Sequence, residues 1–366
     1  MGNKNDIIDV DEVKTEVAKV ENRRFSYEPP QWLKGMKKHL YVGLIAGVLI
    51  TSIWFLVKES MRSVAVAILI TAAITFALRF ILGIVTANKT HKVRFIANLV
   101  FVLAAVVVFF SVTVLTAAPK FLFYPNFDEN AYASLTEHEQ AEELAIKTEN
   151  GVLRGWFLHQ TTSPAPLVLY FSGNGGNASK TVNDLISTPE RLACFEGCHF
   201  ACVDYPSYGK SEGTISDDQL RQYALEVYDY LINREEVTEI LVLGYSLGTG
   251  VANYLASERD VSGLMLMAPY ADGYDLYNGM MNIFHGPLRL LVTYKMDAAS
   301  YAKSIEIKPL ILASPMDEMV SYASSTRLFQ SYPNGCNFVT VEGIGHNEFW
   351  ESQTVLNKLS EYIKER

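Results

Sequence analysis

The sequence predicts an α/β protein, in which a mostly parallel, doubly wound sheet of about eight strands follows three transmembrane helices. Three apolar stretches crowd the first third of the 366 residues. After residue 144, short apolar runs alternate with longer amphipathic segments, a pattern typical of strands interleaved with helices. We therefore divide the chain into a polar tail (1–39), a membrane region (40–118), a juxtamembrane linker (119–143) and a globular domain (144–366) with a short cap near 270–300.

Each apolar stretch is long enough to cross a membrane. Stretches 40–57 and 95–118 carry no charge, and stretch 64–85 is interrupted only by Arg79. A helix of this length crosses a hydrocarbon core of roughly 30 Å. Some forty mostly polar residues precede the first stretch, so we expect an uncleaved anchor rather than a signal peptide. The sequence thus predicts a multi-pass protein with the lipid bilayer as a partner.

Charge predicts the orientation and argues against one class of partner. Basic residues near the expected spans divide six to three: Lys34, Lys37, Lys38, Lys89, Lys92 and Arg94 against Lys58, Arg62 and Lys120. This excess predicts a cytoplasmic N-terminus and, after three crossings, a globular domain outside the cytoplasm at the cell membrane. The net charge is −9, without a basic block among the aromatics, so we expect no nucleic acid partner.

The expected elements of the globular domain follow from the apolar runs. The strands are 144–148, 152–158, 166–171, 199–205, 239–244, 261–268, 309–314 and 337–342. The helices are 178–194, 217–233, 248–258, 323–332 and 348–364. The first two strands form a hairpin around residues 149–151, and the later order of strand, helix, strand indicates parallel pairing.

Ser246 lies between the expected strand 239–244 and the expected helix 248–258, within Gly244-Tyr245-Ser246-Leu247-Gly248. In a nucleophile elbow the strand turns sharply into the helix, which strains the serine and requires very small neighbours two residues away on each side. The helix N-terminus also points free amides at a developing oxyanion. The motif in this context predicts a serine nucleophile.

A serine nucleophile needs a base and an acid that orients it. Of the two histidines after Ser246, only His346 lies on a loop directly after a strand, whereas His285 lies in a Met-rich and aromatic insertion. Asp317 directly follows the preceding strand and is the expected acid. Asp272 is the second candidate for the acid and Asp297 the third.

The loop after the third expected strand, Ser172-Gly173-Asn174-Gly175-Gly176-Asn177, is rich in glycine. It predicts an oxyanion hole formed by the amides of Asn174 and Leu247, with Gly175 as the alternative to Asn174. The loop lacks the Lys-Ser/Thr ending of a phosphate-binding P-loop. The cysteine spacing Cys194, Cys198, Cys202 is not a usual zinc pattern, and we expect neither a metal nor an organic cofactor.

Five motifs, in this order, resemble the α/β-hydrolase superfamily. They are GNGGN at 173–177, DYPSYGKSEG at 204–213, GYSLG at 244–248, DEMV at 317–320 and GH at 345–346. The chain is most similar to its membrane-tethered serine hydrolases, which include protein depalmitoylases and lysophospholipases, and the resemblance covers about 119–366. The chain departs from the pattern at two places: Ser172 replaces a usual histidine, and Ser314-Pro315 replaces a common His-Gly.

The resemblance implies a hydrolase in which Ser246 attacks a carbonyl, His346 moves the proton, Asp317 fixes the imidazole and water resolves the acyl-enzyme. The apolar run at 121–124 and the expected cap suggest an acyl ester or thioester substrate, either a small molecule, a lipid or an acylated protein. We expect nine residues to line an acyl groove: Tyr270, Tyr274, Tyr277, Met280, Met281, Phe284, Leu288, Leu290 and Leu291. A serine peptidase and a non-catalytic membrane-bound binding module remain alternatives.

Overall fold

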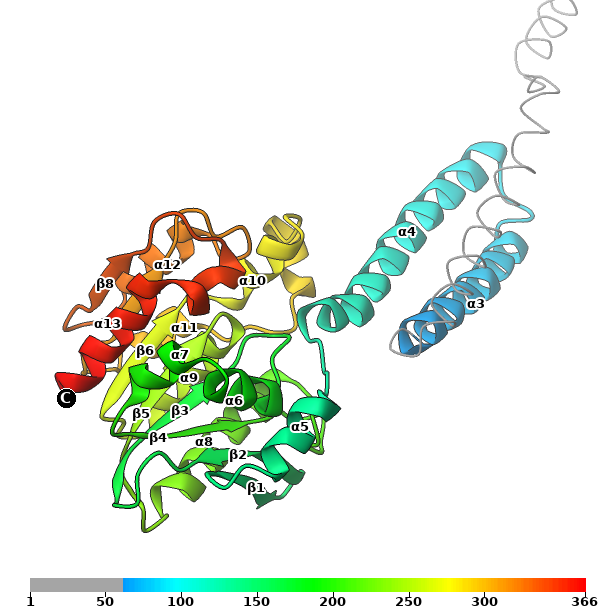
Figure 1. Cartoon of the computed structure of the whole chain (residues 1–366). Coiled ribbons are helices and arrows are strands. Elements are labelled where there is room, and N and C mark those ends of the chain that lie inside the picture. Colours follow the sequence, from blue (N-terminus) through cyan, green and yellow to red (C-terminus); the bar gives the residue numbers. More distant parts are fainter. Residues whose placement is uncertain (1–61) are drawn as a thin grey trace, which may run out of the picture. The chain divides into compact units, whose positions relative to one another are not determined.

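The computed structural model describes residues 62–366 (Figure 1). The tail 1–39 and the first expected span, 40–57, lie outside the described residues. The chain divides between Val102 and Leu103 into two compact units.

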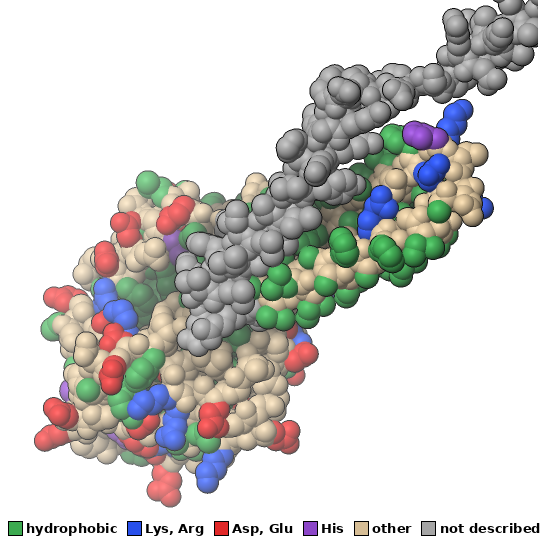
Figure 2. Space-filling view, turned by 90° about the vertical axis from the view of Figure 1, so that its right-hand side faces the viewer, with side chains coloured by type: hydrophobic (Ala, Val, Ile, Leu, Met, Phe, Trp, Pro, Cys, Tyr) green, Lys and Arg blue, Asp and Glu red, His purple; other side chains and the backbone are tan. Residues whose placement is uncertain are grey.

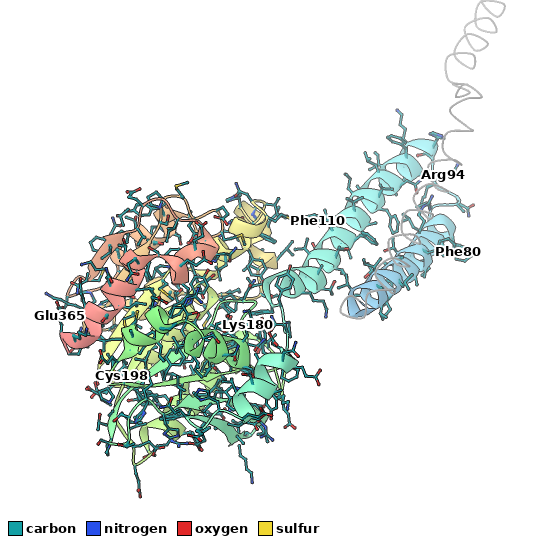
Figure 3. All side chains as sticks on the ribbon, viewed as in Figure 1. Phe80, Arg94, Phe110, Lys180, Cys198 and Glu365 are labelled. Carbon is teal, nitrogen blue, oxygen red and sulfur yellow. The ribbon has the colours of Figure 1, made fainter. Side chains whose placement is uncertain are left out.

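Two long helices, α3 (Arg62–Val85) and α4 (His91–Leu122), contain the second and third expected spans. Within the described residues, Val64–Val85 and His91–Ala117 are long and apolar enough to cross a membrane. Large apolar side chains along both helices are exposed, including Phe80 at 66% and Phe110 at 42% (Figure 3), and apolar side chains line these helices in Figure 2. A helix that is apolar on its exposed faces suits a lipid environment.

The globular domain is built on a sheet with strand order β1-β2-β4-β3-β5-β6-β7-β8. The strands are β1 (Ala141–Thr148), β2 (Gly151–Leu158), β3 (Ala165–Phe171), β4 (His199–Val203), β5 (Val237–Tyr245), β6 (Gly263–Met267), β7 (Leu310–Ala313) and β8 (Asn337–Thr340). β2 pairs antiparallel with both β1 and β4, and the remaining pairs are parallel. The predicted eight-stranded, mostly parallel sheet is confirmed.

Helices cover both faces of this sheet. They are α5 (Glu129–Thr136), α6 (Ala178–Ile186), α7 (Pro189–Leu192), α8 (Asp217–Ile232), α9 (Leu247–Glu258), α10 (Gly273–Met280), α11 (Ala298–Ala302), α12 (Tyr322–Phe329) and α13 (Gln353–Lys364), with 3₁₀ turns η2 (Ala193–Phe195), η3 (Gly286–Leu291) and η4 (His346–Glu351). Alternate residues of β5 point into two separate cores, one packed with α8 and α9 and the other with α6 and α13. Two cores on opposite faces define a doubly wound sheet.

Local chemistry explains where the helices differ from expectation. The expected helix 178–194 is interrupted because Pro189 is the first residue of α7 and Thr188 before it is extended, at φ −123° and ψ 93°. The segment expected to be a linker contains α5, whose N-terminus is capped by Asp128 through the amide of Ala131 at 2.9 Å. Leu135 anchors α5 in a core at 1% exposure.

Candidate active site

Ser246 forms the turn between β5 and α9. Its backbone has φ 50° and ψ −117°, a conformation that an L-residue adopts only under strain. The amide of Ser246 donates a hydrogen bond to the carbonyl of Met267 on β6 at 2.9 Å. The turn has the geometry of the predicted nucleophile elbow.

The two glycines of the motif are required by close backbone approach. A Cβ at Gly248 would lie 2.1 Å from the carbonyl oxygen of Phe171, at the end of β3. A Cβ at Gly244 would lie 2.7 Å from the carbonyl oxygen of Gly248. Contacts under about 3 Å cannot be relieved when the partner is backbone, so each position excludes a side chain.

The structure brings the three expected side chains, Ser246, His346 and Asp317, into one chain of contacts. Oγ of Ser246 lies 2.9 Å from Nε2 of His346. Nδ1 of His346 lies 2.8 Å and 2.9 Å from the two carboxylate oxygens of Asp317. The side chains of His346 and Asp317 are 9% and 2% exposed. This order of contacts matches a serine, a base and an orienting acid.

The other candidates for the base and the acid lie elsewhere. Asp272 caps α10, where it accepts from the amide of Asp275 at 3.2 Å, and it forms an ion pair with Arg327. Asp297 caps α11 through the amide of Ser300. His285 is exposed and contacts Asn282. These residues serve local helix structure, so of the three aspartates considered only Asp317 contacts His346.

Two residues that we did not single out from the sequence fix the histidine. The hydroxyl of Tyr245 donates to the carbonyl of His346, and the two rings stack with centroids 5.4 Å apart. Burial raises the pKa of Tyr245, which keeps this donor protonated. The carboxylate of Glu318 accepts from the amide of His346 at 3.1 Å. The adjacency of Glu318 to Asp317 was the only sequence signal for this contact.

The two residues expected to supply the oxyanion amides lie beside the serine. Asn174 and Leu247 both line a cavity of about 140 Å³ that also reaches Ser246 and His346. Within the described part of the chain, neither backbone N–H donates a hydrogen bond. The rest of the cavity wall is largely apolar: Leu122, Leu276, Met319 and Val320. Two free amides beside a serine hydroxyl could stabilise a negatively charged oxygen.

A second, larger cavity of about 350 Å³ reaches Ser246 from the glycine-rich loop 173–177. Aromatic walls come from Tyr170, Tyr245 and Trp350, and polar groups from Lys180, Asp184 and Arg191. Lys180 forms an ion pair with Asp184 at 2.6 Å. The serine therefore stands between a small apolar cavity and a larger, mixed one.

The expected acyl groove differs from these cavities. Tyr270, Tyr277 and Phe284 are at most 3% exposed and belong to the domain core, while Leu290 is 84% exposed. Of the eight expected residues whose side chains the structure describes, none lines either cavity at Ser246; Leu276 of the same segment lines the smaller one. The buried aromatic residues of this segment therefore pack in the domain core, whereas η3 buries none of its residues.

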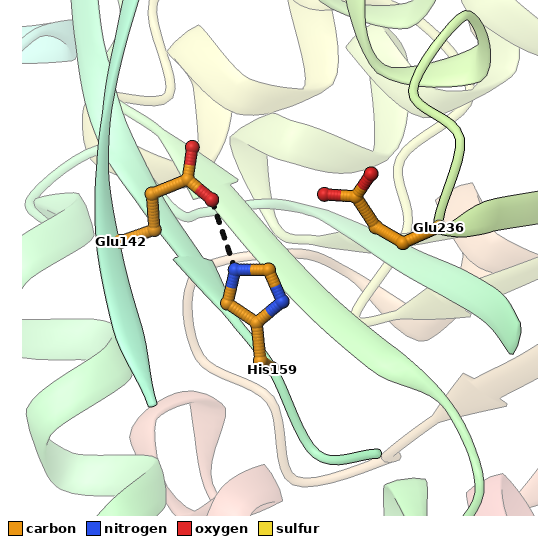
Figure 4. A group of neighbouring side chains, drawn as sticks. All are labelled: Glu142, His159 and Glu236. Atoms are coloured by element: carbon orange, nitrogen blue, oxygen red, sulfur yellow. Dashed lines mark hydrogen bonds and ion pairs between the residues drawn. The ribbon is translucent and has the colours of Figure 1, made fainter. Parts of the chain in front are cut away.

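One group of potential metal ligands lies away from the serine, formed by Glu142, His159 and Glu236 (Figure 4). Arg234 donates to both carboxylates, at 2.7 Å to Glu142 and 2.8 Å to Glu236 through its Nε, and also lies over the ring of Phe157. The positive charge between these carboxylates is therefore the guanidinium, which makes the group an ion-pair network.

The four cysteines are free thiols. Burial raises the pKa of both Cys194 and Cys198 to about 11, so they are protonated at neutral pH and poor nucleophiles. The cysteines therefore offer no competing nucleophile to Ser246.

Comparisons with known proteins agree with this fold. A family model described as the alpha/beta hydrolase fold matches residues 166–294. Alpha/beta hydrolase domain-containing protein 17C of Xenopus tropicalis is 25% identical over 236 residues, 63% of this chain and 72% of that protein. Lysophosphatidylserine lipase ABHD12 of Bos taurus is 30% identical over 131 residues, 34% of this chain and 32% of that protein.

Among solved structures, Est1E from Butyrivibrio proteoclasticus with bound ferulic acid has a TM-score of 0.50 and 20% identity, over 61% of this chain and 98% of that one. This likeness shows the α/β-hydrolase fold. Together, the family model, these relatives and this structural likeness support an α/β-hydrolase superfamily protein of the ABHD type, as the resemblance in the motifs predicted.

Proposed function

We propose that this chain is a membrane-anchored serine hydrolase that cleaves acyl ester or thioester bonds. The observation that carries the proposal is the contact chain from Ser246 through His346 to Asp317, with two free amides beside the serine. The hydrolase fold and a relative named as a lipase support ester hydrolysis as the general activity. A domain that only binds a partner needs none of these contacts.

The geometry supports the following mechanism. Nε2 of His346 accepts the proton of Ser246 as Oγ attacks the carbonyl carbon of the substrate, and the imidazolium returns that proton to the leaving group. The carboxylate of Asp317 holds the proton on Nδ1, which keeps Nε2 free to accept. The amides of Asn174 and Leu247 stabilise the oxyanion. Water, deprotonated by His346, then hydrolyses the acyl-enzyme and restores the serine.

The small cavity favours an acyl chain as the group next to the carbonyl. Its walls are the apolar side chains of Leu122, Leu276, Met319 and Val320, and each buried methylene contributes about 0.8 kcal/mol to binding. Leu122 is also the last residue of α4. A substrate held in or near the bilayer is therefore favoured over a freely diffusing polar metabolite.

The proposed location is the cell membrane, with the hydrolase domain outside the cytoplasm. Two long apolar helices support the anchor, and the excess of basic residues around Lys37 and Lys92 supports the orientation. The expected first span is part of this topology, since three crossings are needed to place the domain outside.

Labelling combined with a substrate panel tests the proposal. Wild type should react with a fluorophosphonate probe, and Ser246→Ala should lose both labelling and turnover, by about 10⁶ in kcat. Across p-nitrophenyl esters and matched thioesters, kcat/KM should rise from acetyl to medium and long chains. An alanine variant with comparable turnover contradicts the serine mechanism.

Aminopeptidase substrates in the same panel address the alternative enzyme class. Efficient peptide cleavage, or a preference for acetyl esters, contradicts the proposed substrate class while leaving the serine mechanism intact. A wild type that neither reacts with the probe nor turns over any ester contradicts the hydrolase proposal itself and favours a binding module.

A further inference from the structure

The last residue of helix α4 and the four residues that follow it run beside the loop that carries Asn174. We call residues 122–126 the juxtamembrane strap. The side-chain amide of Asn174 donates to the carbonyl of Leu122 at 2.9 Å. The carbonyl of Asn174 accepts from the amide of Tyr124 at 3.4 Å. The strap therefore holds two of the polar groups of Asn174, while its backbone N–H stays free beside Ser246.

A buried tyrosine hydroxyl fastens the strap to the same carbonyl. Oη of Tyr208 donates to the carbonyl of Asn174 at 2.7 Å and accepts from the amide of Tyr124 at 2.9 Å. Tyr208 is fully buried, and its ring packs edge-on against Tyr205 with centroids 5.6 Å apart. Because the ring cannot move freely, its hydroxyl sets the distance between strap and loop.

Asn126 connects the strap to the end of the loop. Its side-chain amide donates to the carbonyl of Gly175. Its side-chain oxygen accepts from the side-chain amide of Asn177 at 2.6 Å, and the side-chain oxygen of Asn177 in turn caps α6 by accepting from the backbone amide of Lys180. One asparagine side chain thus spans residues 175–177, just after Asn174.

The strap is itself fixed in the domain. Leu122 is 2% exposed and lines the small cavity at Ser246. Phe123 is 6% exposed, and its ring packs edge-on against Tyr294 with centroids 5.5 Å apart. The backbone carbonyl of Asn126 accepts from the amide of Gly209 at 3.0 Å. Because the strap is held at these points, it can keep the neighbouring loop 173–177 in a fixed position.

We propose that the juxtamembrane strap positions the active-site loop, with Asn126 and Tyr208 as the positioning residues that hold the amide of Asn174 where the oxyanion develops. This inference rests on the proposed function, because only acyl transfer develops an oxyanion at that amide. Loss of one oxyanion donor costs about 10²–10³ in kcat, so a displaced donor should cost about tenfold or more.

The test compares two pairs of variants of the full chain in lipid nanodiscs. Tyr208→Phe is matched by Tyr223→Phe, because Tyr223 is also buried and donates its hydroxyl to a carbonyl, that of Val203, at 2.6 Å. Asn126→Ala is matched by Asn130→Ala, since Asn130 is an exposed asparagine of α5. For each variant, kcat and KM are measured with an acyl ester, and Ki with a trifluoromethyl ketone of the same chain length.

The ketone separates positioning from folding, because its bound adduct carries an oxyanion and the ground-state ester does not. Tyr208→Phe and Asn126→Ala should lower kcat about tenfold or more and raise Ki by the same factor, with KM unchanged. A variant that merely unfolds a fraction of the enzyme lowers kcat but leaves both KM and Ki unchanged. That second pattern, or an equal loss in the matched controls, overturns the proposal.

Hydrogen exchange gives a readout that needs no turnover. The amides of residues 173–177 should exchange faster in both strap variants than in wild type and the controls. Unchanged exchange overturns the strap's role whatever the activity. If exchange rises but wild type hydrolyses no ester, the proposed function fails and the holding of this loop by the strap is supported.

Discussion

The hydroxyl of Ser314 donates a hydrogen bond to the carbonyl of Ile344 at 2.6 Å, and so joins the loop after β7 to the loop after β8. The first loop carries Asp317 and the second carries His346. The same hydroxyl accepts from the amide of Met316 at 3.1 Å. Ser314 is one of the residues in which this chain departs from the common family pattern, and its hydroxyl links the two segments that carry the proposed acid and base.

Replacing Asp317 by Asn should lower kcat by about 10⁴, because the amide no longer holds the productive tautomer of His346. Asp272→Asn is the matched control, since Asp272 caps α10 and does not contact the histidine. Turnover of both purified, folded variants with one ester checks the ranking. A larger loss in Asp272→Asn would mean that the acid has been assigned to the wrong strand.

Gly248→Ala should destabilise the domain by about 3 kcal/mol or more and abolish activity, because the new Cβ would lie 2.1 Å from the carbonyl oxygen of Phe171. Gly197→Ala is the control: Gly197 has φ 84°, but a Cβ added there would meet no atom within 4 Å, so only the backbone cost of about 1–2 kcal/mol applies. Thermal unfolding of both variants gives the comparison. Equal losses would argue against a steric requirement at the elbow.

Asp204 should make the stability of the domain fall as pH rises. Burial raises the pKa of Asp204 to about 7 in the folded chain, against 3.8 for an ordinary aspartate. Between these values the folded state holds a proton that the unfolded state has lost. The contribution of Asp204 to the free energy of unfolding should therefore be largest below pH 4 and decline toward pH 7. The total loss should be at most about 4 kcal/mol.

Thermal midpoints of wild type and Asp204→Asn between pH 4 and pH 8 measure this effect. The midpoint of wild type minus that of the variant should fall as pH rises, because wild type loses the contribution of the protonated acid whereas the amide cannot ionise. Asp260→Asn, at an exposed carboxylate, serves as the control. A difference that is constant with pH contradicts a protonated Asp204.

The side of the membrane on which the domain lies can be measured with a thiol label. Glu365→Cys places a thiol at the exposed end of the chain, in a background carrying Cys336→Ser because the other three cysteines are buried. We expect a membrane-impermeant maleimide to label this variant in intact cells. Labelling only after permeabilisation would place the domain in the cytoplasm.

The sequence predicted those features that follow from local pattern. The eight strands and the positions of Ser246, Asp317 and His346 could be predicted because each of these residues directly follows a short apolar run, and the ends of parallel strands meet at one edge. The proline at position 189 could have predicted the break, but the helical pattern of residues 178–194 favoured one continuous helix. The order of the last two strands also made it possible to choose Asp317 over Asp272 as the expected acid.

Contacts between distant segments could not be predicted. Nothing in the sequence near Asn126 reveals that its side chain reaches Gly175 and Asn177 about fifty residues later. The residues of the expected cap are all apolar, but in the folded domain some of them are buried in the core and others are exposed to solvent. Composition reports how much apolar surface a segment has, and only tertiary structure determines what that surface covers.

Leu122 ends helix α4 and also lines the cavity beside Ser246. Under the proposed function, anchoring and substrate recognition therefore share a residue, and the two could not be inherited as separate modules. A recombination event that exchanged the membrane segment for another would keep the specificity of the enzyme only if its joint fell before Leu122. A recombination point even a few residues later would replace Leu122 in the wall of the cavity by a residue of the other protein. A new membrane segment and a new substrate preference would then arise together.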